Sequence, residues 1–140
     1  MTLLTFESKQ FDIINEPRND INLIFGHSLA EMLRQNFKQR GHETFDEVET
    51  EDWGWYFDTK IDGQNYMVGA IAFVDTHPET EEPVIDDEPI GFLVQFDKYR
   101  GWKDVLLGRN KLTPNDPVIS ITEAIIKSEV LDLQNYEREV

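Results

Sequence analysis

The dipeptide Asp62-Gly63 separates two runs rich in aromatic, β-branched and small residues, 53–61 and 64–74. Such a dipeptide is typical of a two-residue turn with left-handed backbone, so the sequence predicts a β-hairpin. In the register that this turn imposes, bulky residues meet small ones across the strands. The opposed pairs are Trp55 with Ala70, Tyr56 with Gly69, Trp53 with Ala72 and Gly54 with Ile71. Another register would lose this match, so the hairpin constrains the fold strongly.

The same register sorts the side chains of the hairpin onto two faces. One face carries Trp53, Trp55, Phe57, Val68, Ala70 and Ala72. It is almost wholly apolar, so we expect a helix to pack on it. The other face, which holds Tyr56, is more mixed. An exposed indole beside charge is also typical of recognition sites, but the alanines opposite Trp53 and Trp55 favour a role in the core.

Two helices are predicted outside the hairpin. The first runs from Asp20 to Arg40, with a cap at Asn19 or Asp20 and a stop at Gly41. Its apolar residues recur at spacings of three and four. They are Ile21, Ile24, Phe25, Leu29, Met32, Leu33 and Phe37. The second helix runs from Pro117 to Val130, because proline suits the first turn of a helix.

Further strands are predicted at Thr44–Thr50 and Ile90–Asp97. The tail from Leu131 to Val140 reads either as a short last strand or as a frayed end. We therefore expect an α+β fold in the order α-β-β-β-β-α, with an antiparallel sheet of about four strands flanked by an N-terminal and a C-terminal helix. At 140 residues, 1–140 forms a single domain, with a mobile acidic loop at 76–89.

Acidic residues are concentrated in two stretches, 43–58 and 75–88, that contain no Lys or Arg. Each stretch holds seven acidic residues, and together they hold half of the chain's 28, on a formal net charge of −15. Charge gathered in this way attracts cations and basic surfaces and repels nucleic acid and anionic lipid. The composition therefore indicates a basic partner and no nucleic acid or membrane.

The candidate partner-binding residues come from both stretches. They are Glu47, Glu49, Glu51, Asp52 and Tyr56, with Asp86, Asp87 and Glu88 as an outer rim. On a strand, Glu47, Glu49 and Glu51 would line one face at intervals of roughly 7 Å. Such a row suits the Lys and Arg side chains of a partner, but a solvated edge strand uses the same pattern to avoid pairing with a neighbour.

No catalytic signature is present. The chain lacks cysteine, so disulfides and thiolate chemistry are excluded. His27 and Ser28 are adjacent on the predicted helix, where neighbouring side chains point about 100° apart, so they form a poor base–nucleophile pair. The acidic loop lacks the spacing of a calcium site. We predict no catalytic residue, no metal and no cofactor.

The chain shows neither a signal peptide at its start nor an apolar run long enough to span a bilayer. A cytoplasmic location is the simplest prediction. One basic segment breaks the acidic pattern, with cations at positions 98, 100, 103, 109 and 111 and Tyr99 and Trp102 among them. Two interpretations stay open: it binds an anion or an RNA strand, or it pairs with the chain's own acid.

The run Glu51-Asp52-Trp53-Gly54-Trp55, the Asp62-Gly63 turn and the later stretches Gly108-Arg109-Asn110-Lys111 and Asp116-Pro117 resemble a group of small uncharacterised bacterial proteins. The resemblance covers roughly the last two thirds of the chain. It implies a bacterial cytoplasmic setting and no particular chemistry.

These features predict a non-enzymatic acidic binding protein that neutralises a basic protein partner, of the toxin-immunity or antitoxin type, for example against a nuclease toxin. Two alternatives stay open. One is a nucleic-acid mimic that acts on a DNA-binding or defence protein. The other is a carboxylate-based metal-dependent hydrolase. The sequence leaves the oligomeric state undetermined.

Overall fold

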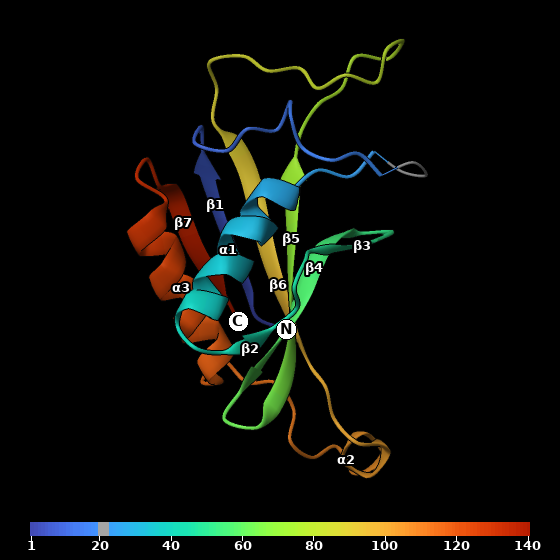
Figure 1. Cartoon of the computed structure of the whole chain (residues 1–140), viewed down its shortest axis with the longest axis vertical. Helices are drawn as coiled ribbons and strands as arrows, with labels where there is room; N and C mark the ends of the chain where they lie inside the picture. The colour runs from blue at the N-terminus through green and yellow to red at the C-terminus, as the bar shows by residue number, and fades with distance from the viewer. Residues whose placement is uncertain (20–22) are drawn as a thin grey trace.

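The computed structural model describes residues 1–19 and 23–140. They form an α+β fold built on one antiparallel sheet, and two helices lie across one face of that sheet (Figure 1). The elements in chain order are β1 (Leu3–Ser8), α1 (His27–Gln39), β2 (Glu43–Thr44), β3 (Glu49–Glu51), β4 (Gly54–Ile61), β5 (Gln64–Phe73), β6 (Ile90–Lys98), α2 (Trp102–Leu107), α3 (Pro117–Glu129) and β7 (Gln134–Glu139).

The sheet has seven strands in the order β2-β4-β5-β6-β1-β7, and β3 also pairs with β4. The predicted α+β class and antiparallel sheet are confirmed, but four strands is too few. The N-terminal strand β1 was not predicted. It pairs with β6 on one side and with β7 on the other, so the C-terminal tail is a strand and not a frayed end. The short helix α2 was also not predicted, and it stands off one end of the sheet (Figure 1).

The central hairpin forms in the predicted register. Asp62 and Gly63 adopt positive φ angles of 50° and 82°, and Ile61 pairs with Gln64 on either side of them. Trp55 lies opposite Ala70 and Tyr56 opposite Gly69, as the sequence predicts.

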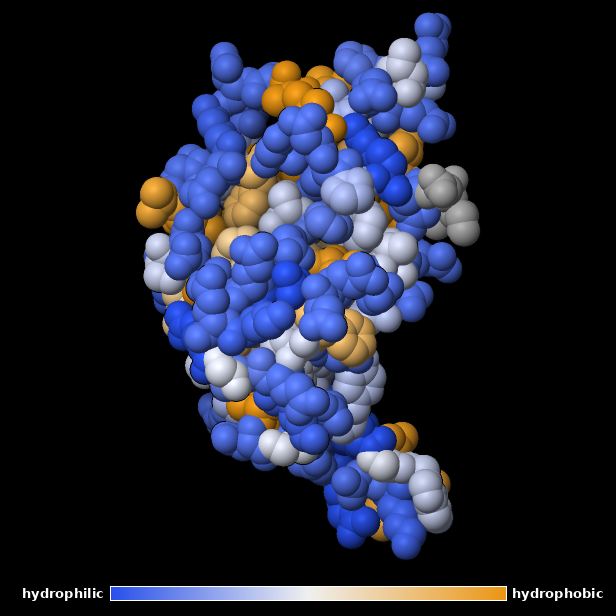
Figure 2. All heavy atoms as spheres, viewed as in Figure 1, coloured by the Kyte–Doolittle hydropathy of each residue, from blue (hydrophilic) through white to orange (hydrophobic). Residues whose placement is uncertain are grey.

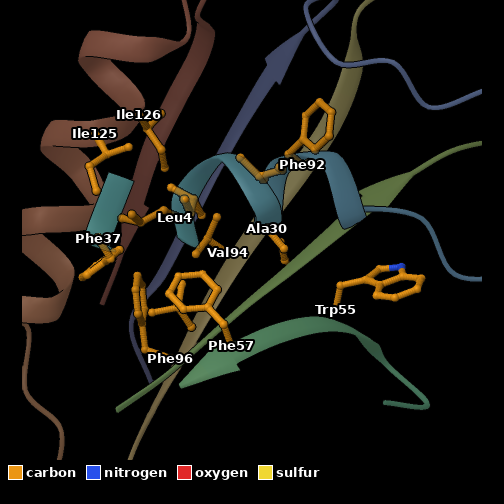
Figure 3. Packing of buried hydrophobic residues seen from close by; sticks show 14 of the residues in the cluster. Leu4, Ala30, Phe37, Trp55, Phe57, Phe92, Val94, Phe96, Ile125 and Ile126 are labelled. Atoms are coloured by element: carbon orange, nitrogen blue, oxygen red, sulfur yellow. The ribbon is translucent and has the colours of Figure 1, made fainter. Parts of the chain in front are cut away.

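The core lies between the sheet and the two long helices. Alternate residues of β4, β5, β6 and β1 point toward α1 and α3 and are buried. Phe37 of α1 packs on Phe57 of β4 with ring centroids 5.6 Å apart, and Figure 3 shows Phe96 beside them. Ile125 and Ile126 of α3 close the same cluster. Apolar burial of this kind is the main favourable term in folding.

The prediction that Trp53 faces Ala72 is wrong. Strand β4 begins at Gly54, and Trp53 lies in the turn that joins β3 to β4. Phe25 takes the expected place instead, since the Ala72 N–H donates to the Phe25 carbonyl at 2.8 Å. Because β4 begins at Gly54, it has no residue opposite Ala72. The edge of β5 can therefore pair there with the segment that precedes α1.

The first helix starts later than predicted, at His27 and not at Asp20, which lies outside the described residues. Asn19 is not its cap, because its side-chain amide donates to the Thr50 hydroxyl at 2.9 Å. The carboxylate of Glu16 caps the helix instead: it accepts from the N–H groups of Gly26, His27 and Ser28 at 3.0, 3.2 and 2.9 Å. A buried anion at this position also complements the helix dipole.

The predicted polar strand at 44–50 is interrupted. It divides into β2 and β3 because the chain bends between them and Val48 turns into the core, where it is 9% exposed. The helix predicted from Pro117 forms and ends at Glu129.

The acidic loop 76–89 stands away from the sheet (Figure 1) and is closed by a bridge between Thr76 and Pro83. Its mobility and the division into one domain stay predictions.

Candidate interaction surface

The second face of the sheet carries no helix in the part of the chain that the structure describes. Both long helices lie on the same side, which is the side turned toward the viewer in Figure 1. The residues on the uncovered face follow from the strand register and include Tyr56, Asp58, Met67, Gly69, Ile71, Leu93, Gln95 and Asp97. Met67, Ile71 and Leu93 are half-buried although no element packs over them. We call this surface the open face.

Three aromatic rings form a row at the β3–β4 edge of the open face. The ring of Tyr56 lies between the other two, with its centroid 6.4 Å from that of Phe45 and 6.3 Å from that of Trp53. Phe45 shares this face because its N–H donates to the Asp58 carbonyl and so extends the pairing of β2 with β4. Trp53 lies flat enough over the sheet to cover Gly69, whose missing side chain leaves room for the indole.

Carboxylates border this row. Glu49 is paired with Tyr56 and Glu51 with Gly54, so both lie on the open face. Asp58 lies two residues beyond Tyr56 on β4 and therefore on the same face. We define the acidic strip as Phe45, Glu49, Glu51, Trp53, Tyr56 and Asp58.

Among the described residues, no Lys or Arg forms an ion pair with a carboxylate of the acidic strip. In segment 43–58 the described ion pairs comprise one contact, between Asp46 and Lys38 at 3.9 Å, and both side chains are well exposed there. The pKa of the Tyr56 hydroxyl is raised by burial and then by the negative charges of Asp58, Glu51 and Glu49. These carboxylates therefore act together on one position.

Asp58 is the most constrained acid of the strip. Its carboxylate accepts a hydrogen bond from the Tyr99 hydroxyl at 2.7 Å. Burial raises the pKa of Asp58, the nearby Asp97 raises it further, and the Tyr99 hydrogen bond lowers it in part. The pKa of Tyr99 is raised strongly by burial and by its bond to Asp58. A cation placed here would relieve the repulsion between the two aspartates.

The structure brings together some of the predicted partner-binding residues. Glu49, Glu51 and Tyr56 belong to the acidic strip, and Asp52 lies in the turn beside it. Glu47 lies in the bend between β2 and β3, so it leaves the predicted row.

The predicted rim lies elsewhere. Asp86, Asp87 and Glu88 line a separate hollow of about 150 Å³, whose other lining residues are Lys9, Phe11, Asp12, Ile13, Ile14, Ile85 and Ile90. Whether any of the predicted residues binds a partner stays a prediction.

Sequence reasoning missed Phe45, Asp58 and Tyr99, and it placed Trp53 on the wrong face. The pairing of Tyr56 with a glycine was a usable signal, because a glycine in a strand often marks close approach by another group. The Tyr99–Asp58 contact joins residues 41 positions apart and leaves no trace in local pattern.

Among residues 1–19 and 23–140, no three His, Asp or Glu side chains gather as a metal site would require. Within the same residues no helix has the length and apolar character needed to cross a bilayer. Searches of protein-family models, curated proteins and solved structures find no match for this chain.

Proposed function

We propose that this chain is a non-enzymatic binding protein that uses the acidic strip to hold and neutralise a basic protein partner, in the manner of a toxin-immunity protein or antitoxin. The observation that carries the proposal is the aromatic row of the open face, bordered by carboxylates that form no ion pair with any described residue. A nuclease toxin is a fitting partner, since proteins that act on nucleic acid carry clusters of cationic side chains. A cytoplasmic setting is part of the proposal.

Arginine is the side chain that such a strip fits best. Its guanidinium is planar and stacks on aromatic faces, and it also forms paired hydrogen bonds with a carboxylate. The rings of Tyr56 and Trp53 offer the stacking surface, and Glu49 and Glu51 offer the acceptors. A net charge of −15 adds a long-range field that speeds the encounter with a cationic protein.

The nucleic-acid mimic shares this electrostatic basis but needs an extended row of carboxylates. The row on β3 holds Glu49 and Glu51, because Glu47 lies in the preceding bend. This observation favours a compact basic epitope over a long nucleic-acid groove. The carboxylate-based metal-dependent hydrolase has no observation that favours it.

A binding titration with octa-arginine and octa-lysine peptides tests the proposal. We expect the chain to bind octa-arginine more tightly than octa-lysine, because lysine gains little from stacking. The variant E49Q/E51Q should weaken octa-arginine binding about tenfold. The variant E79Q/E129Q removes the same charge from exposed positions outside the strip and should change the affinity less than about twofold.

Two results would contradict the proposal. Equal losses in both variants would mean that diffuse charge and not the strip holds the peptide. Affinity that is the same at 20 and 300 mM salt would exclude electrostatic recognition, because exposed charges are screened over about 10 Å at 0.1 M. If neither result is found, co-purification with a basic protein encoded beside this chain's gene would identify the natural partner.

A further inference from the structure

The short helix α2 has no buried residue, although it is mostly apolar. Trp102 is 72% exposed, Leu106 74% and Leu107 62%. The helix stands off the lower end of the body in Figure 1, and Figure 2 shows apolar and polar atoms together on this projection. Exposed apolar groups gathered in this way mark an interaction site more often than chance.

The projection is an ordered unit. Gly108 ends the helix in the left-handed conformation at φ 65°, and the Arg109 N–H returns to the Asp104 carbonyl at 2.7 Å. The Arg109 guanidinium lies 3.4 Å from the Asp104 carboxylate, and the Arg100 guanidinium donates to the Arg109 carbonyl at 2.8 Å. We call residues 99–111 the prong.

The charge of the prong is opposite to that of the rest of the molecule. It contains Arg100, Lys103, Arg109 and Lys111 against the single acid Asp104, a net charge of +3. Since the chain totals −15, the remaining residues carry −18. An acidic protein surface that also exposes apolar side chains complements the prong in both charge and hydropathy.

The open face is such a surface. Its carboxylates Glu49 and Glu51 lie on the same face as the half-buried Ile71 and Leu93, which pair with each other on β5 and β6. The prong does not lie on these residues within one chain, since it stands off the end of the sheet (Figure 1). It leaves β6 at Lys98, five strand positions beyond Leu93, a separation of roughly 17 Å along the sheet.

We propose that the prong of one molecule docks on the open face of a second copy of this chain. The apolar tip formed by Trp102 and Leu106 covers Ile71 and Leu93, and Lys103 and Lys111 meet the carboxylates of the acidic strip. The inference shares with the proposed function the premise that the strip binds cations. It predicts in addition that self-association and a basic partner compete for one surface.

Analytical ultracentrifugation of the whole chain over a range of concentrations tests this proposal. We expect reversible self-association, and L106E should raise its Kd about thirtyfold, which corresponds to about 2 kcal/mol. L131E is the matched control, because Leu131 is 89% exposed and lies outside the prong. Its Kd should stay within about twofold of the original chain. Neither variant loses a buried contact, so both should fold.

A charge exchange gives the sharper test. K103E/K111E and E49K/E51K should each weaken self-association, and the chain that carries all four substitutions should regain it, because an acidic prong then meets a basic strip. A chain that is monomeric at every concentration overturns the proposal. So does a monomer that sediments with phosphatidylcholine or phosphatidylglycerol vesicles through Leu106. In both cases the chain should still bind octa-arginine. Failure of the self-association proposal can therefore be distinguished from failure of the proposed function.

Discussion

The indole of Trp53 lies directly over Gly69 of β5. A β-carbon added to Gly69 would come within 2.5 Å of the Trp53 Cη2 atom and within 2.6 Å of Cζ3. Real side chains do not approach so closely, so the glycine is required by the indole above it. The two residues are 16 positions apart, and their contact holds one end of the aromatic row in place.

We therefore expect Gly69→Ala to displace the Trp53 ring. The rim of an indole can move, so the free energy of unfolding should fall only by about 1 kcal/mol. Tryptophan fluorescence should shift toward that of exposed indole, and octa-arginine should bind more weakly. Gly91→Ala is the matched control, because its nearest neighbour, Phe73 Cδ2, lies at an ordinary 3.6 Å. Unchanged fluorescence in Gly69→Ala would disprove this arrangement.

Glu16→Gln tests the remote cap of α1. Glu16 is 6% exposed, and its carboxylate accepts hydrogen bonds from three backbone N–H groups at the start of the helix. The amide has one acceptor oxygen and no charge, so we expect the free energy of unfolding to fall by about 1–2 kcal/mol in urea denaturation. Glu79→Gln, at an exposed loop position, should leave it within about 0.5 kcal/mol. Equal effects of the two substitutions would contradict the capping role.

The buried pair of Lys98 and Asp116 makes stability depend on pH. The Lys98 amino group lies 3.0 Å from the Asp116 carboxylate, and the Tyr66 hydroxyl donates to the same oxygen at 2.6 Å. Burial alone would raise the pKa of Asp116, but hydrogen bonds from Tyr66, Thr113 and Lys98 together hold it below its ordinary value. The ionised form therefore stabilises the fold above about pH 4, and this contribution is lost as pH falls below that value.

We expect Asp116→Asn to lower the free energy of unfolding at pH 7 by about 3 kcal/mol, because it leaves the Lys98 charge buried without its partner. The deficit should shrink at pH 3, where part of the original contribution is already lost. Urea denaturation at both pH values measures it. Asp46→Asn, at a fully exposed carboxylate, should show neither effect. A deficit that is the same at both pH values would contradict the assigned role.

The pKa of Asp58 on the open face is shifted in the opposite direction to that of Asp116, because burial outweighs the hydrogen bond from Tyr99. The pKa of Asp58 is raised in the folded state, so protonation of this group favours folding and its charge is a cost at neutral pH. Tyr99→Phe removes the donor and should raise the pKa of Asp58 further, which a carbon-13 titration of the carboxyl group can follow. Tyr136→Phe, whose hydroxyl binds Glu123, should leave it unchanged. A lower midpoint in Tyr99→Phe would show that the bond does not act on the ionised form.

Local chemistry in the sequence was sufficient to predict the hairpin and its register. Asp62-Gly63 permits the left-handed turn, and the alternation of bulky and small residues allows one pairing, so 55–61 and 64–70 pair as expected. The start of α3 was predictable for the same reason, because Pro117 suits a first helical turn and is excluded from later ones. The negative charge of the acidic stretches was also predictable, because it depends only on which residues they contain.

The tertiary structure decided the rest, because the deciding contacts join residues far apart in the chain. The start of α1 depends on Glu16, which reaches the helix from outside it. The place opposite Ala72, which the sequence assigned to Trp53, is taken by Phe25. Strand β1 becomes part of the sheet only because β6 and β7 accept it on either side. The acidic strip has the same origin: its rings and carboxylates come from separate strands, and only the folded sheet brings them onto one face.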